Sequence, residues 1–566
     1  MSPNDPTLFG REEIVDRILR RALDLRTGYR QNLALLGPLR IGKSTILQHS
    51  VAVLQQHPPL LPVYLELRAE ATLREFTEQF AATLLYRYWA TEGREPPKTL
   101  EALLPLCRPY LPRTIALLTT ALAKARRGHA SALRALFEAP GQLRQESGRL
   151  CVILVDEFHR LSAWERAGAF AALGHQITVQ KDTMYVLASS SVEDARRILQ
   201  ERLALLFGQF EVVPVGSFDM ATSVRFLEAR AGLGFLGAPA LTMIADLVEG
   251  HPYALDQVAR AVKTVTVPEG APAVERFCAA LDAICCRPEG VLARQCQEAL
   301  DGLPGRRRAE MLPILIAVAE GHHRVPAVAQ ATGRRPRDVT RLLRVLVAAG
   351  LVVRRGVFYV IANHLLQFWL VTVHRPQQGP VQLDPQLASR AFAAEVQRFL
   401  AQATSRAPQT VLDTVAELLR RFQNELVEIH GRRVRLPKLD VHTLLLPGIP
   451  RAAVGQREQA LWVCIPYATV MRESDAVTLI HTLRTVAKPW GRRIVVALGG
   501  LDVNARLLLQ EQRFWVWELD DLNALLSLYG LLRLLPTSWP AMASVAAMPA
   551  AGAGEGVAKV AQEASA

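Results

Sequence analysis

Lysine, paired cysteines and long apolar stretches are all scarce in this 566-residue chain. Only eight of the 66 basic residues are lysine, although the formal net charge is +13. No uncharged apolar run reaches about 18 residues, which argues against a membrane-spanning helix. The opening residues, MSPNDPTLFGREE, are polar and acidic where a secretory signal needs an apolar segment. We therefore expect a cytoplasmic protein that makes no contact with a membrane.

The seven cysteines include no CxxC pair, the spacing that most often marks a zinc site. Four of them, Cys278, Cys285, Cys286 and Cys296, nevertheless lie close together in a segment that reads as helical. Zinc binding by this cluster is one interpretation. We favour the other, in which they are reduced structural thiols of a cytoplasmic protein.

Half of the residues are hydrophobic, which is enough for sizeable cores. The length suggests three or four domains at ordinary domain sizes. A net charge of +13 and a pI near 9.7 favour acidic partners such as nucleic acid or an anionic surface, without defining a fold.

A phosphate-binding loop is predicted by GPLRIGKST at residues 37–45, which satisfies the pattern GxxxxGK[ST]. An apolar run precedes it and a helical segment follows, so the helix N-terminus would face the phosphates. Lys43 is expected to reach the β- and γ-phosphates and to act in catalysis, and Ser44 to bind Mg²⁺. The alternative is a glycine-containing strand–helix turn. The expected nucleotide contacts are Gly37, Pro38, Leu39, Arg40, Ile41, Gly42, Lys43, Ser44 and Thr45.

An acidic pair ends a second buried strand in LCVILVDEFHRL, residues 150–161. Asp156 is placed to hold Mg²⁺ through water. Glu157 is placed to orient and deprotonate the attacking water, and is the predicted catalytic base. Taken alone, the pair could instead cap a helix, but beside a phosphate loop the hydrolytic role is the better interpretation.

Two further strands complete the predicted parallel, doubly wound sheet, at residues 60–69 and 182–191. The second ends in small polar residues, and Ser189 and Ser190 would lie beside the γ-phosphate as a sensor. A plain strand–turn is the alternative. Residues 71–148 between the strands read as amphipathic helices. They would form a contact surface for DNA, a partner or a neighbouring subunit, or would simply cover the sheet.

Together with LFGREEIVDRIL (8–19) and EGHPYALDQVARAV (249–262), these motifs resemble the archaeal-type ATPases of the STAND branch of AAA+-like proteins. The resemblance implies ATP as ligand, with Gly10 and Arg11 on the adenine side and Pro252 in a helical lid that closes over the nucleotide. It also implies that sites can be completed between subunits of a homo-oligomer. The family often has a Gly-Arg pair where this chain has Gly208 and Gln209. The arginine of that pair is a candidate arginine finger. Three nearby arginines could take its place, although we favour the interpretation in which they form a solvated helix face: Arg196, Arg197 and Arg202.

The order helix, helix, turn, helix and hairpin at residues 306–365 predicts a winged helix-turn-helix. Its core face would come from Val339, Leu342, Leu343, Leu346 and Val347. Arginines on the predicted recognition helix and wing suit phosphates and guanine edges of duplex DNA. Such modules also bind proteins, which remains the alternative. The predicted DNA contacts are Arg334, Arg335, Arg337, Arg341, Arg344, Arg354 and Arg355.

The C-terminal third resembles the PD-(D/E)xK nuclease-like domains that this family often carries. Asp440 and Glu395 are candidate acids, but the apolar stretch 463–466 stands where Glu-x-Lys is needed for metal-dependent cleavage. We therefore expect a restriction-endonuclease-like α/β fold without nuclease activity. The Ala- and Gly-rich end is expected to be disordered.

These interpretations give an ordered set of domains. The predicted parts are a P-loop core at 1–215 with its insertion at 71–148, a helical lid at 216–300, a winged helix at 301–375, a nuclease-like domain at 386–535 and a tail at 536–566. Two functions fit them: an ATP-hydrolysing switch that couples nucleotide state to DNA binding, or a signalling switch that holds a protein partner without touching DNA.

Overall fold

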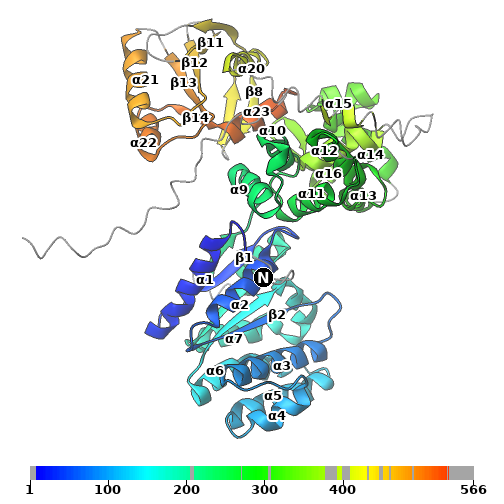
Figure 1. The fold of residues 1–566 in the computed structure, drawn as a ribbon, viewed down its shortest axis with the longest axis vertical. Helices are drawn as coiled ribbons and strands as arrows, with labels where there is room; N and C mark the ends of the chain where they lie inside the picture. The colour runs from blue at the N-terminus through cyan, green and yellow to red at the C-terminus, as the bar shows by residue number, and fades with distance from the viewer. Residues whose placement is uncertain are drawn as a thin grey trace, which may run out of the picture. The chain divides into compact units, whose positions relative to one another are not determined.

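The computed structural model of the chain describes residues 8–129, 131–203, 210–268, 270–303, 307–375, 390, 392–394, 396–397, 408–429, 432–444, 450–457, 460–486, 490–531 and 533–534. It divides into two compact units, one of Met1–Thr222 with Gly250–Tyr253 and the other of Ser223–Glu249 with Ala254–Ala566. Their elements are drawn in Figure 1. No helix in the described ranges combines the length and apolarity needed to cross a membrane. Glu395, Gly208, Gln209 and the expected tail at 536–566 lie outside these ranges.

The first unit is built on a five-stranded parallel sheet in the order β2-β3-β4-β1-β5. The strands are β1 (Asn32–Leu36), β2 (Leu60–Glu66), β3 (Leu150–Asp156), β4 (Thr183–Ser189) and β5 (Phe210–Pro214). Every residue of β1, β3 and β4 is buried, as expected for central strands covered on both faces. The predicted parallel α/β sheet is confirmed.

Helices cover both faces of this sheet (Figure 1). On one face, α1 (Glu12–Asp24) and α2 (Lys43–Leu54) bury Ile18 and Ile46 against β1 and β3. On the other, α7 (Ala169–Val179) buries Phe170. The two apolar layers fix the strand ends relative to one another.

The insertion between β2 and β3 forms α3 (Leu73–Thr91), α4 (Leu100–Cys107), α5 (Pro112–Arg126) and α6 (Ser131–Ser147). A capping box between Thr72 and Glu75 starts α3. Phe80 and Phe137 meet edge to face at 6.0 Å within the same core as Ile153 of β3. These helices therefore cover the sheet, one of the two roles expected of the segment.

The second unit begins with helices that include α10 (Ala238–Leu247), α11 (Pro252–Thr264), α12 (Ala273–Leu281) and α13 (Val291–Asp301), with α9 (Met220–Arg225) before them. Cys278, Cys285 and Cys296 are buried there. Burial raises the pKa of Cys278 to about 11 and that of Cys296 to about 12. Nowhere in the described part of the chain do three His, Cys, Asp or Glu side chains gather as metal ligands.

Three helices and a hairpin follow in the expected order: α14 (Arg308–Ala319), α15 (Val325–Thr332), α16 (Pro336–Ala348), β6 (Val352–Arg355) and β7 (Phe358–Ile361), with α17 (His364–Trp369) after them. Val339, Leu342, Leu343 and Leu346 of α16 are fully buried. The expectation for Val347 was wrong, because it is 36% exposed in the last turn of α16, one position beyond the buried stripe.

The C-terminal sheet has the order β10-β11-β12-β13-β14, antiparallel from β10 to β12 and parallel from β12 to β14. Its strands are β10 (Asp440–Leu444), β11 (Ala452–Arg457), β12 (Ala460–Tyr467), β13 (Trp490–Ala497) and β14 (Trp515–Glu518). The helices around it are α20 (Pro408–Arg420), α21 (Glu473–Thr485), α22 (Val503–Glu511) and α23 (Leu519–Leu528). A separate hairpin joins β8 (Glu425–Ile429) to β9 (Arg432–Leu436).

The β6–β7 hairpin packs into the core of the C-terminal domain. Phe358 is 1% exposed and meets the Tyr529 ring edge to face at 5.1 Å. Arg324, just before α15, forms an ion pair with Glu425 of β8. A Cβ atom on Gly356 at the hairpin tip would lie 2.1 Å from the carbonyl oxygen of Leu426. Hairpin and C-terminal domain therefore share one hydrophobic core.

We predict that Gly356→Ala destabilises the second unit more than Gly350→Ala does. Both glycines have positive φ, +69° and +72°, so both changes carry the left-handed penalty of about 1–2 kcal/mol. Only Gly356 adds a steric conflict with a neighbouring strand, whereas the Gly350 position is open. Thermal unfolding followed by tryptophan fluorescence measures the difference. Equal shifts in Tm for the two variants would show that the tip does not pack tightly on β8.

Candidate nucleotide site

The loop at residues 37–45 joins the end of β1 to the start of α2 at the carboxyl edge of the sheet. Gly42 has φ +101° and comes directly before Lys43, the first residue of α2. Gly37 passes so close to the strand β5 extension that a Cβ would lie 2.1 Å from the carbonyl oxygen of Val215. Both glycines are therefore required by the backbone path, one by its dihedral angle and the other by close approach.

Lys43 lies inside this loop rather than on the surface, with 3% of the residue exposed. Its Nζ donates to the carbonyl oxygens of Gly37 at 2.9 Å and Pro38 at 2.8 Å. Burial lowers the pKa of Lys43, while the carboxylates of Glu157 and Asp156 act against that shift. The ammonium group is thus poised beside the cradle of backbone N–H groups where phosphate oxygens would bind.

Asp156 joins the loop to β3. Its Oδ2 accepts a hydrogen bond from Ser44 Oγ at 2.5 Å and another from the Tyr64 hydroxyl at 3.2 Å. The residue is 1% exposed, and burial together with Asp156 raises the pKa of Tyr64. Hydroxyl and carboxylate oxygens are the ligands that Mg²⁺ prefers, so this pair fits the predicted metal site.

Glu157 has left-handed backbone dihedrals, φ 54° and ψ 41°, which a residue other than glycine rarely adopts. Its Oε2 accepts hydrogen bonds from the backbone N–H of Ser190 at 2.9 Å and from the Ser190 hydroxyl at 2.7 Å. Strain of this kind concentrates at functional sites. The structure thus brings Glu157 together with one of the two predicted sensor serines.

His159 joins the same group, which the sequence reasoning missed. Its Nδ1 lies 2.9 Å from Oγ of Ser189, the other sensor serine, and 3.3 Å from Glu157 Oε2. The available signal was its place two residues after Glu157 in DEFH. A single histidine after a strand gives no indication of the direction in which its ring points, so the sequence alone could not assign it.

The segments around Gly10 and Pro252 also lie in this unit. The Arg11 guanidinium donates to the Gly216 carbonyl oxygen and stacks over the Phe218 ring at 4.7 Å. The Phe218 N–H donates to the carbonyl oxygen of Gly250 at 3.0 Å. Residues 216–218 therefore contact both Arg11 and the segment 250–253.

His251, directly before Pro252, places Nε2 3.2 Å from the carbonyl oxygen of Leu39. Arg40 lies over the Tyr253 ring at 4.7 Å. Residues 250–253 are therefore in contact with the predicted phosphate loop, while the Gly10 segment is linked to them through residues 216–218.

The arginines suggested as substitutes for a finger form ordinary surface pairs. Arg197 pairs with Asp194 at 2.5 Å and Arg202 with Glu165 at 3.6 Å. Arg196 is exposed on α8 (Val192–Arg197). These contacts agree with the solvated helix face, which was the preferred interpretation.

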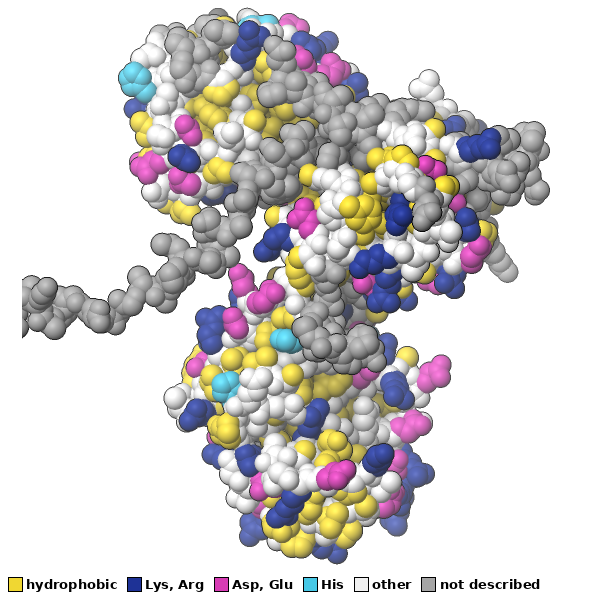
Figure 2. All heavy atoms as spheres, in the orientation of Figure 1, with side chains coloured by type: hydrophobic (Ala, Val, Ile, Leu, Met, Phe, Trp, Pro, Cys, Tyr) yellow, Lys and Arg dark blue, Asp and Glu magenta, His cyan; other side chains and the backbone are white. Residues whose placement is uncertain are grey.

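The predicted DNA-contacting arginines lie on α16, at the two positions before it and on the hairpin. Of the seven, six are exposed and Arg334 is partly buried. Arg341 lies 3.8 Å from Asp338, and Arg354 Nε donates to the Gly356 carbonyl oxygen at 3.0 Å. Basic and acidic side chains are interspersed over the face shown in Figure 2, so the net positive charge is not confined to one patch there.

Within the described part of the C-terminal domain, no three His, Cys, Asp or Glu side chains lie together as metal ligands. Residues 432–444 contain two strands, β9 and β10, which pair with different partners. Asp440 starts β10 opposite Gln456, at the end of β11 that lies away from Arg451. Asp440 remains a candidate acid only, since Glu395, the other candidate, lies outside the described residues.

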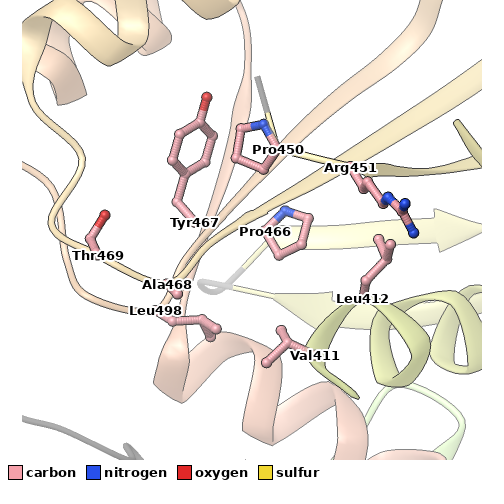
Figure 3. Close-up of a pocket in the computed structure, with 9 residues that line it drawn as sticks. All are labelled: Val411, Leu412, Pro450, Arg451, Pro466, Tyr467, Ala468, Thr469 and Leu498. Atoms are coloured by element: carbon pink, nitrogen blue, oxygen red, sulfur yellow. The ribbon is translucent and has the colours of Figure 1, made fainter. Parts of the chain in front are cut away.

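A pocket of about 380 Å³ lies instead at the carboxyl end of β12 (Figure 3). Its described lining is mostly apolar, and burial raises the pKa of Tyr467 to about 12. On the strands beside it, Ala453 faces Cys464. The described lining residues are Val411, Leu412, Pro450, Arg451, Pro466, Tyr467, Ala468, Thr469 and Leu498, of which only Arg451 carries a charge.

No family model matches the chain, and no curated protein matches it in sequence. Among solved structures, the Walker-type ATPase PABY2304 of Pyrococcus abyssi is 18% identical, with 64% of this chain and 96% of that one covered and a TM-score of 0.43. The Aeropyrum pernix ORC2 protein in its ADPNP–ADP complexes is 15% identical, with 71% and 98% covered and a TM-score of 0.41. The Aeropyrum pernix ORC1 protein in complex with DNA is 15% identical, with 71% and 96% covered and a TM-score of 0.33. With TM-scores below 0.5, the chemistry of the site has to be derived from its own geometry.

We expect Lys43→Ala to weaken ATP binding by roughly 10- to 100-fold, since a hydrogen bond to a charged group is worth about 1.5–3 kcal/mol. A fluorescent ATP analogue titrated against the full chain measures the loss. Lys181→Ala, which removes the same charge from an exposed position in the same unit, should bind like wild type. Unchanged affinity in Lys43→Ala would refute a phosphate-binding role for the loop.

Proposed function

We propose that the chain is an ATP-binding and ATP-hydrolysing molecular switch of the STAND and AAA+ type. Its nucleotide state would be coupled to DNA binding through a winged helix at residues 306–365. The observation that carries the proposal is the convergence of Lys43, Ser44, Asp156 and Glu157 at the carboxyl edge of one parallel sheet. Open α/β sheets bind ligands at this edge.

Each member of the site has a distinct role in this proposal. The N–H groups of residues 37–45 and the ammonium of Lys43 would bind the phosphates, with Arg11 and Pro252 on the adenine and lid sides. Ser44 and Asp156 would hold Mg²⁺, which when bound supplies positive charge to the phosphate oxygens. Glu157 would orient the attacking water and accept its proton.

The lid segment links the nucleotide site to the second unit through the continuous backbone. His251 contacts the loop carbonyl of Leu39, and the chain continues without interruption from Pro252 into α11. A change in the loop on nucleotide binding would therefore act on the start of this helix. Such a two-state element, biased by ATP and released on hydrolysis, is what a nucleotide switch requires.

DNA binding is proposed from the α16 helix and its flanks. Arg337, Arg341 and Arg344 extend into solvent from the helix that would enter the major groove, with Arg335 at its start. Guanidinium groups suit phosphate oxygens and guanine edges. The partner best suited to this surface is duplex DNA.

A second candidate is a switch that holds a protein partner without DNA contact. The packing of the β6–β7 hairpin into the C-terminal core favours it, because part of the hairpin is already covered by another segment of the same chain. None of the described residues that line the pocket at β12 is an acid, so we do not propose nuclease activity.

Steady-state ATP hydrolysis with and without duplex DNA tests the proposal first. We expect Mg²⁺-dependent hydrolysis that DNA accelerates and that Lys43→Ala abolishes. Slow hydrolysis that ignores DNA would favour the protein-holding switch. A chain that neither binds nor hydrolyses ATP would refute both candidates.

DNA contact itself is tested with Arg341→Ala/Arg344→Ala. If both arginines bind phosphates, the slope of log K against log salt should become shallower by about 2, because each lost phosphate contact contributes about 0.9. Arg20→Ala/Arg26→Ala removes the same charge from the exposed side of α1 and its end, and should leave the slope unchanged. Fluorescence anisotropy over a salt series provides the measurement. Equal effects of the two double variants would show that the arginines of α16 contribute only general positive charge to DNA binding.

A further inference from the structure

The His159 side chain connects the predicted base to the predicted sensor strand. His159 is the second residue of η2 (Phe158–Ala167), which begins directly after Glu157, and 19% of its side chain is exposed. The same ring nitrogen, Nδ1, faces both Ser189 Oγ at 2.9 Å and Glu157 Oε2 at 3.3 Å. The serine oxygen and the glutamate carboxylate therefore compete for one hydrogen on Nδ1.

The hydrogen-bond directions can be worked out from the neighbours. The Ser189 hydroxyl donates to the carbonyl oxygen of Ser191 at 3.0 Å, so its single hydrogen is already used. Nδ1 must then be the donor toward Ser189 Oγ, and the same N–H faces the carboxylate of Glu157. A hydrogen on Nδ1 fits both contacts, while burial lowers the pKa of His159.

We propose that His159 is a positioning residue that orients the Glu157 carboxylate for water activation and ties that orientation to strand β4. The inference rests on the proposed ATPase function. Ser190 and His159 both contact Oε2, so together they restrict the rotation of the carboxylate about the last side-chain bond. Oε1 is then left in a defined direction to receive the proton of a water molecule.

The connection to β4 gives this arrangement a second consequence. Ser189 is the last residue of β4, and its carbonyl oxygen accepts from the N–H of Gly37 at 3.3 Å. His159 therefore links the base to the strand end that supports the first residue of the phosphate loop. A shift of that strand end on phosphate binding would reach Glu157 through the imidazole.

Replacing His159 with Asn and with Gln separates the effect of a hydrogen-bond donor at the place of Nδ1 from the effect of a polar side chain in general. The side-chain amide nitrogen of Asn lies near the place of Nδ1, while that of Gln reaches the place of Nε2. We expect His159→Asn to retain kcat within about threefold and His159→Gln and His159→Leu to lose about tenfold, with KM for ATP and ATP affinity unchanged in all three. His175→Leu, at an exposed position on α7, is the matched control and should behave like wild type.

The outcomes separate this inference from the function on which it rests. Equal kcat for the Asn and Gln variants, a rise in KM that matches the loss in kcat, or a faster rate in His159→Leu would overturn the positioning role while wild-type hydrolysis stands. A wild-type chain that does not hydrolyse ATP would overturn both. If His159→Leu does not fold, the comparison of Asn with Gln still decides, because both substitutions are polar and of moderate size.

Discussion

The candidate site depends on one constraint, the parallel alignment of β1, β3 and β4. Because these strands run in the same direction, their carboxyl ends meet at one edge of the sheet. Ser44 follows β1 and Asp156 ends β3, with β4 between them, yet their side chains are joined by a 2.5 Å hydrogen bond. The helices on the two faces keep the strands in register, and the described helices of the insertion at 71–148 share a hydrophobic core with β3.

The parts of the site that could be predicted from the sequence are those with fixed local spacing. GxxxxGKS defines a backbone path that few other residues can follow, and five buried residues before Asp156 and Glu157 identify a strand with acids at its end. His159 has no such pattern, since its role depends on the ring direction and on Ser189, 30 residues away. Side-chain direction across two elements is a tertiary property that one sequence does not encode in any short window.

The same distinction, between local spacing and tertiary packing, explains which details the sequence did not predict. The three helices and the hairpin at 306–365 follow from periodicity, but Val347 lies just outside the buried stripe because α16 ends at the surface. The role of Asp440 depends on which side chains meet it across the sheet, and strand register cannot be read from one sequence. The packing of Gly356 on Leu426 joins segments 70 residues apart, and no local signal predicts it.

The shared core of the β6–β7 hairpin and the C-terminal domain also bears on how such a chain can be rearranged in evolution. Phe358 belongs to the hairpin, but its burial depends on Tyr529 and on residues of α20. A gene fusion that exchanged the C-terminal domain alone would leave this ring in water and the Arg324 charge without Glu425. The α16 helix, the hairpin and the C-terminal sheet are thus expected to be inherited as one module.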